Sequence, residues 1–274
     1  MRLFGIDYNR PCPGIAINEP KKKGLRRLIE LFSVSYGDFA RINLLFFLII
    51  SPSAALFFLG FFGVGGAPFY LLSIGAAFPI GGAITACMFC LAKTLRDDPG
   101  YLLHDFKRKL MENARQAALP GMIYAAFVYI QIYYWMGAYL GRVAVGYGTL
   151  ALLFVSSVFF EMIAPYVFLQ TAYLELKTSS IIQNSVIIAL KNAPKSVCGM
   201  LAGRIVWVFF ALYFPLSLWW APLLVLYGFV LPWLVNLMWI WPDVDAIFSI
   251  DITLKAVRDS KTRDIEPVFT SHEL

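Results

Sequence analysis

The sequence predicts an all-α fold: a polytopic helical membrane protein with six transmembrane helices and cytoplasmic amphipathic helices. Three observations support this prediction, namely six long apolar stretches, a composition that is 59% hydrophobic and only 15% charged, and a mean hydropathy of +0.69. A water-soluble domain of 274 residues rarely has such a composition. We therefore expect the lipid bilayer to be the main solvent and a principal partner of this chain.

The six apolar stretches are each close to the ~20 residues that a helix needs to cross a hydrocarbon core about 30 Å thick. We expect spans at residues 42–62, 69–91, 118–139, 147–168, 198–219 and 223–241. They divide the chain into a cytoplasmic N-terminal segment with an interfacial helix (1–41), a six-helix transmembrane domain (42–241) and a cytoplasmic C-terminal tail (242–274).

The basic residues predict the orientation of these spans. Of 23 Lys and Arg residues, eight precede the first span, six lie from Lys93 to Arg115, three from Lys177 to Lys195, and four lie at or after Lys255. Basic residues accumulate on the cytoplasmic side of membrane proteins, so six spans place both termini in the cytoplasm of a multi-pass protein of the plasma membrane. The same basic residues face anionic lipid, and we expect no nucleic-acid partner because no reader motif accompanies them.

Amphipathic segments flank the predicted spans. Residues 25–39 alternate apolar and charged positions at helical spacing and are expected to lie in the membrane interface before span one. Two further amphipathic helices are expected in the cytoplasm, one before span three and one before span five. Their apolar residues are candidates for contact with a partner protein: Leu103, Phe106 and Leu110 on the first helix, and Ile182 and Val186 on the second.

Span two has a face with almost no side-chain bulk, formed by Gly75, Pro79, Gly82 and Ala86 at three- and four-residue spacing. Small residues let two membrane helices approach closely, so that dispersion forces hold them together. We therefore interpret this face as a helix-packing face. The alternative is a helix broken at Pro79 that exposes backbone to a substrate, as in transporters.

Glu161 is the one acidic residue and Arg204 the one basic residue inside a predicted span. Glu161 lies nine residues before the cytoplasmic end of span four near Gln170, and Arg204 lies eight residues after span five begins near Ser196. At 1.5 Å per residue, both lie roughly 12–14 Å inside the membrane. Equal depth on consecutive antiparallel helices predicts an intramembrane ion pair, which could be structural or could form a gate or a contact for an anionic substrate.

Sequence motifs for catalysis, nucleotide binding and zinc binding are missing, so we expect no enzyme activity, cofactor or metal site. Cys87 and Cys90 lie on predicted span two without a second pair or a histidine nearby, which favours helix packing over metal binding. Glu161 has no second carboxylate in any span to act with it.

Several motifs resemble the YesL-like membrane proteins of Gram-positive bacteria, which share a domain of unknown function (624). The resemblance is carried by residues 8–14 (YNRPCPG), 19–22 (EPKK), 43–45 (NLL), 95–101 (LRDDPGY) and 189–194 (ALKNAP), together with Asp105-Phe106 and Asn184. Position 12 is often glycine in that family, so Cys12 is a departure. Members of that family are often encoded beside carbohydrate ABC transporters and glycan-degrading enzymes.

The resemblance implies a noncatalytic accessory or regulatory membrane protein of a carbohydrate ABC uptake system, with ABC permease subunits or other membrane proteins as its partners. The chain lacks a clear counterpart of the loop with which a sugar permease docks its ATPase, which 111–121 only faintly approaches. The alternative hypothesis is a small transporter or channel that uses Glu161 and Arg204 on its pathway.

Overall fold

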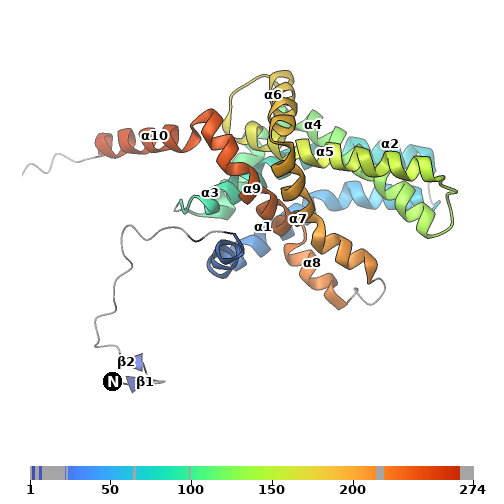
Figure 1. Cartoon of the computed structure of the whole chain (residues 1–274), viewed down its shortest axis with the longest axis horizontal. Helices are drawn as coiled ribbons and strands as arrows, with labels where there is room; N and C mark the ends of the chain where they lie inside the picture. The colour runs from blue at the N-terminus through green and yellow to red at the C-terminus, as the bar shows by residue number, and fades with distance from the viewer. Residues whose placement is uncertain are drawn as a thin grey trace, which may run out of the picture.

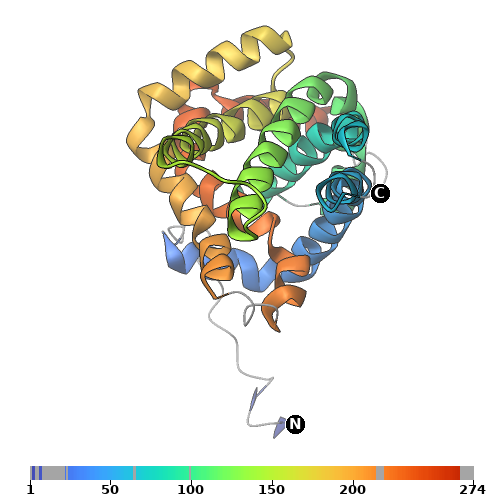
Figure 2. The ribbon, with the colours of Figure 1, turned by 90° about the vertical axis from the view of Figure 1, so that its right-hand side faces the viewer.

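The computed structural model describes residues 2–3, 6–7, 22, 24–63, 66–98, 100–213 and 219–265. The described part of the chain is almost entirely helical (Figures 1 and 2). Two short strands, β1 (Arg2–Leu3) and β2 (Ile6–Asp7), pair near the N-terminus. The helices are α1 (Leu25–Phe61), α2 (Ala67–Ala76), α3 (Phe78–Leu95), α4 (Leu102–Tyr139), α5 (Tyr147–Tyr173), α6 (Thr178–Lys191), α7 (Ala193–Leu212), α8 (Ala221–Tyr227), α9 (Val230–Phe248) and α10 (Ile250–Ile265).

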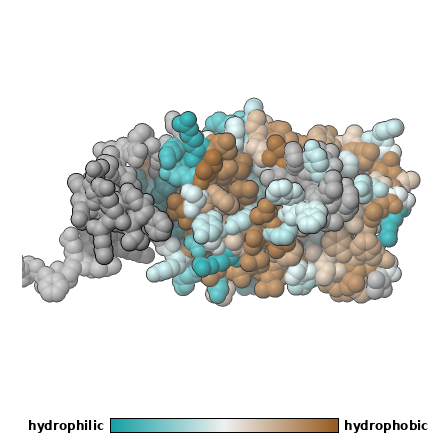
Figure 3. All heavy atoms as spheres, turned by 90° about the horizontal axis from the view of Figure 1, so that it is seen from below, coloured by the Kyte–Doolittle hydropathy of each residue, from teal (hydrophilic) through white to brown (hydrophobic). Residues whose placement is uncertain are grey.

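Four of the described helices, α1, α3, α4 and α5, are long and apolar enough to cross a membrane, and the bent pair of α8 and α9 makes up to five. The surface agrees with this composition: Figure 3 shows a face on which hydrophobic side chains cover a broad area and hydrophilic ones gather toward one end. The expected multi-pass, all-helical architecture is therefore compatible with the structure. Predicted span five corresponds to α7, and residues 214–218 of that span lie outside the described residues.

Two of the predicted amphipathic helices, the interfacial one at 25–39 and the cytoplasmic one before span three, are not separate elements. The amphipathic segment 25–39 and span one form the single 37-residue helix α1, and the segment after the turn at 96–101 joins span three in the 38-residue helix α4. A change from an amphipathic to an apolar sequence alters the solvent of the side chains and leaves the backbone hydrogen bonds intact, and α4 continues through its junction even though Pro120 lies there.

Span two, expected as one helix over 69–91, is divided at Ala77 into α2 and α3. Pro79 is the second residue of α3, where its missing N–H costs nothing, whereas inside a continuous helix its ring would clash with the carbonyl of Gly75. Helix α2 packs mainly against α1, and α3 packs mainly against α4. The expected break near Pro79 is therefore present, and the single span is not.

The predicted packing face is correct only in part. Gly75 lies on α2, is exposed and has no atom within 4 Å of the position that a side chain would occupy, so it belongs to no helix contact. Gly82 does pack against α4, where an added methyl group would come within 3.2 Å of the Cα of Ala114. The closest approach, however, is at Gly81, where an added methyl group would overlap the Ala117 carbonyl oxygen and press on Gly121.

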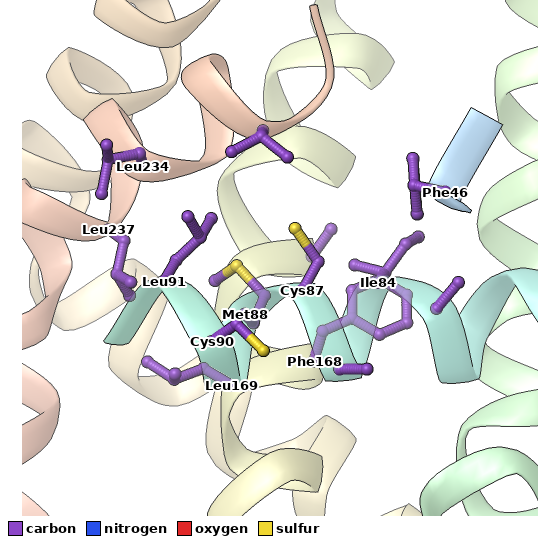
Figure 4. Packing of buried hydrophobic residues seen from close by; sticks show 14 of the residues in the cluster. Phe46, Ile84, Cys87, Met88, Cys90, Leu91, Phe168, Leu169, Leu234 and Leu237 are labelled. Atoms are coloured by element: carbon purple, nitrogen blue, oxygen red, sulfur yellow. The ribbon is translucent and has the colours of Figure 1, made fainter. Parts of the chain in front are cut away.

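Helix α3 is consequently the core of the bundle. Its buried side chains include Cys87, Met88, Cys90 and Leu91, which pack among residues of α1, α5 and α9 (Figure 4). Ala86, the last member of the predicted packing face, is fully buried here. The two cysteines are part of this hydrophobic cluster, and the Cys90 thiol donates a hydrogen bond to the Leu102 carbonyl at 3.4 Å.

Span six, expected as one helix over 223–241, is bent by 51° at the break between α8 and α9. Asn43 of α1, which is fully buried, binds both sides of this break. Its side-chain oxygen accepts the backbone N–H groups of Phe229 and Val230 at 3.0 and 2.9 Å, and its side-chain nitrogen donates to the Val225 carbonyl at 2.6 Å. These bonds satisfy backbone groups that a broken membrane helix would otherwise leave unpaired.

Ionic contacts gather where α3 ends and α4 begins. Arg27 at the start of α1 donates to both carboxylate oxygens of Asp97 at 2.6 Å, and Lys93 forms an ion pair with Asp105 across the turn. The Arg96 guanidinium lies 5.4 Å from the ring centres of both Tyr173 and Trp241. Together these contacts join α1, α3, α4, α5 and α9 at one end of the molecule.

We expect Gly81→Ala to lower stability by about 1–3 kcal/mol, because the added methyl group forces apart two backbones in contact. Gly75→Ala is the matched control, since its side chain enters open space on α2 and alanine favours the helix. The measurement is the melting temperature of both purified variants in detergent. Equal melting temperatures for the two variants would show that α3 and α4 do not meet at Gly81.

Candidate functional site

Glu161 of α5 and Arg204 of α7 form an ion pair, in which Nη2 of Arg204 contacts Oε2 of Glu161. The structure thus brings together the two ionisable residues whose depths match in the sequence. The Glu161 side chain is 14% exposed and the Arg204 side chain 37% exposed, so the carboxylate is the more enclosed partner. At membrane depth, an ion pair offsets part of the cost of removing each charge from water.

Tyr124 of α4 completes the site and was missed by sequence reasoning. Its hydroxyl donates to Oε1 of Glu161 at 2.9 Å and accepts a hydrogen bond from Nη2 of Arg204 at 3.2 Å. The only signal that could have indicated it is depth, since Tyr124 lies six residues inside predicted span three. A tyrosine carries no charge and is common in membrane helices, so the sequence alone gave no reason to single it out.

The three side chains form a closed triangle that joins α4, α5 and α7. Two aromatic rings cover Tyr124 edge-on, Phe168 of α5 with a centroid distance of 5.8 Å and Trp233 of α9 with 6.2 Å. These rings keep water from the phenol and bring a fourth helix to the site. Because each charge faces its counter-charge and the hydroxyl bonds to both, the triangle links the three helices through paired polar groups.

An apolar cavity of about 250 Å³ lies beside this triangle, between α4, α5 and α6. Tyr124 is the one polar residue of its lining, and neither Glu161 nor Arg204 contributes to it. The other lining residues are Pro120, Ile123, Phe159, Phe160, Ile163, Ala164, Val167, Phe168, Ile182 and Val186. A polar substrate would have to give up its hydration in this cavity with almost no hydrogen bonds in return.

The residues proposed for partner contact divide into two groups. On α4, Phe106 is fully buried and Leu110 packs against Gly82, so these two residues belong to the core, and Leu103 is half-buried. The apolar side of the α4 segment is used against α3, which explains its helical period without a partner. On α6, Ile182 and Val186 line the cavity described above.

No protein-family model, curated protein or solved structure matches the chain. The resemblance to the YesL-like family therefore stays a prediction from its motifs. What the described residues define is a helical bundle with several membrane-length apolar helices and an ion pair between α5 and α7.

We expect Glu161→Gln and Arg204→Gln each to lower stability by about 2–3 kcal/mol, because each leaves the other charge unpaired in the bundle. The double variant should lose less than the sum of the two single losses. Tyr124→Phe, which removes one hydroxyl and keeps both charges, should cost only about 1 kcal/mol. Melting temperatures of the four variants in detergent give the comparison, and strictly additive single losses would show that the two charges do not interact in solution.

Proposed function

We propose that this chain is a noncatalytic accessory or regulatory protein of the plasma membrane, which binds a partner membrane protein through helix α6. The resemblance to the YesL-like family makes the permease subunits of a carbohydrate ABC uptake system the partner to test first. The proposal rests on one observation: α6 is held firmly on one side and exposes large apolar residues on the other.

The attachment of α6 is specific. Ile181, Ser185 and Ala189 are fully buried along one side of the helix. The Ser185 hydroxyl accepts a hydrogen bond at 2.9 Å from Nε2 of Gln170 on α5, and both side chains are buried. A buried side-chain bond of this kind fixes the rotation of α6, so the residues on its other side are presented in a defined direction.

The outward side of α6 carries Ile187 and Leu190, which we call the α6 face. Ile187 is 63% exposed and Leu190 is 53% exposed. Lys177 and Lys191 border the helix, a composition that suits the cytoplasmic interface better than the hydrocarbon core. Figures 1 and 2 show α6 at the periphery of the bundle, where a second protein could reach it.

The contacts between chain segments support six spans with both termini in the cytoplasm. In this proposal α1, α3, α4, α5, α7 and the α8–α9 pair cross the bilayer. The ion pairs of Arg27 with Asp97 and of Lys195 with Asp243 join basic segments that would all lie on one side. Arg142, after α4, instead donates to the Phe61 carbonyl. This bond joins the C-terminal ends of α1 and α4, which would lie on the other side of the membrane.

The alternative function is a small transporter or channel that uses Glu161 and Arg204. The two interrupted helices, α2–α3 and α8–α9, favour this reading, because transporters often bind substrates at such breaks. At the α8–α9 break, however, four backbone groups already form hydrogen bonds with side chains. Asn43 bonds to three of them, and the Trp207 indole donates to the Gly228 carbonyl at 3.0 Å. A break whose backbone is satisfied in this way has less to offer a substrate, which favours the accessory role.

Reporter fusions test the topology. A reporter that is active only in the cytoplasm should be active when fused after Leu274 and inactive when fused in the turn at Arg142, because six spans return the chain to its starting side. A second reporter that works only outside the membrane should give the reverse pattern. An active external reporter at Leu274 would overturn the six-span assignment.

Photo-crosslinking in the native membrane tests the α6 face. We expect a photoreactive amino acid at position 187 or 190 to yield an adduct with a distinct membrane protein that mass spectrometry can identify. Leu152 of α5 is the matched control, because it is 68% exposed on the first turns of a membrane-length helix and should react with lipid alone. Lipid adducts alone at positions 187 and 190 would count against a docking role for α6.

A further inference from the structure

A second cavity, of about 320 Å³, lies between α1, α2 and α4 at the end of the bundle opposite Arg27. Five of its nine lining residues are aromatic. The lining consists of Phe57, Tyr70, Ser73, Ile74, Ala126, Tyr129, Ile130, Tyr133 and Tyr134. The cavity exists because α2 turns back along α1 after the break at Ala77 and so places Tyr70 opposite α4.

The rings of this cavity meet at steep angles. Tyr70 and Tyr133 are nearly perpendicular, at 88° with centroids 5.9 Å apart, and Tyr133 meets Tyr134 at the same angle and 5.5 Å. Phe57 meets Tyr70 at 63° and 5.7 Å. Rings arranged in this way present faces in several directions, as the walls of a box do, and each face carries the negative part of the ring quadrupole.

The back wall of the box is held rigidly. Phe57 stacks on Tyr129 with centroids 4.6 Å apart, and the Tyr129 hydroxyl shares a hydrogen bond of 2.5 Å with the Ser53 hydroxyl. Ser53 also donates to the Ser73 carbonyl at 2.7 Å, which fastens α2 to α1. At the half-exposed front, by contrast, the hydroxyls of Tyr70, Tyr133 and Tyr134 make no hydrogen bond to any described residue.

We propose that this aromatic box binds a quaternary ammonium group. No charged residue lines the cavity, so a primary ammonium would lose its water without receiving hydrogen bonds from a carboxylate. A quaternary ammonium has no N–H to satisfy and is held by ring faces alone, which is how aromatic cages recognise it. The group could belong to a small solute or to the headgroup of a phosphocholine lipid, because tyrosines at a span end lie at headgroup depth.

Titration of the purified full-length chain tests the proposal. The chain is kept in a nonionic polyoxyethylene detergent, which carries neither sugar nor ammonium groups, and calorimetry records binding of choline and of its neutral carbon isostere, 3,3-dimethyl-1-butanol. Both ligands have the same shape, so a preference for choline reports the charge. We expect choline to bind about tenfold more tightly or better, as ring faces on several sides of one cation predict.

Two variants locate the site. Tyr133→Leu removes a wall and should weaken choline binding about fivefold or more, whereas Tyr133→Phe keeps the ring and should retain it. Tyr147→Leu is the control, because Tyr147 is 93% exposed outside the cavity. Should Tyr133→Leu fail to fold, Ile130→Trp fills the cavity from a half-exposed position and should abolish binding with little effect on the melting temperature.

The outcomes separate cleanly. Equal binding of choline and its neutral isostere, no binding of either, or choline binding that survives both Tyr133→Leu and Ile130→Trp would each overturn the proposal. Repeating the titration in nanodiscs distinguishes the source of the cation. Weaker choline binding in phosphatidylcholine than in phosphatidylethanolamine, which is equally zwitterionic but has no quaternary ammonium, identifies a lipid headgroup as the ligand, and equal binding identifies a free solute.

Discussion

The contact of α3 with α4 at Gly81 and Gly121 is the constraint on which the rest of the bundle depends. Because neither glycine has a side chain, the two backbones touch, and α3 can lie in the middle of the molecule as a thin helix. In the most apolar 18-residue stretch of α3, 72% of the residues are buried, whereas the corresponding stretches of α1 and α4 are 28% and 33% buried. Four other helices, α1, α4, α5 and α9, pack around it. Close approach replaces the hydrophobic effect here, since lipid tails are as apolar as the helices themselves.

Several polar side chains inside this bundle bind partners on other helices. Asn43 joins α1 to the α8–α9 break, Ser53 joins α1 to α2 and α4, and the Glu161–Arg204 pair with Tyr124 joins α4, α5 and α7. Each of these contacts links segments that are distant in the sequence. In a bilayer an unpaired polar group cannot form hydrogen bonds with water, so it must find a partner on another helix. The few side chains that make insertion costly therefore also determine which helices become neighbours.

Features that depend on the geometry of a single helix could be predicted from the sequence, whereas features that depend on how two helices pack could not. Counting residues from the predicted span ends was enough to pair Glu161 with Arg204, because a helix rises by a constant amount per residue. The same counting could not separate Gly81 from Gly82 as the contact point, since a one-residue shift depends on the rotation of both helices. The helical spacing of apolar residues on α4 correctly indicated an apolar side around Phe106. It could not show whether another helix of the chain or a partner protein covers that side. Pro79 signalled the break of span two, and Pro232, four residues after Gly228, is a comparable signal for the bend between α8 and α9 that the six-span prediction did not use.

The bonds of Asn43 also have a consequence for how the chain is made. Asn43 enters the membrane with the first long helix, whereas the backbone groups that it binds follow more than 180 residues later. During synthesis, the side-chain amide of Asn43 therefore lacks its final hydrogen-bond partners until α8 and α9 have been made. The α8–α9 pair can take its final position only after it has met α1. A product truncated before α8 would retain an unsatisfied amide in its first helix, a feature by which a membrane quality-control protease could distinguish incomplete chains from finished ones.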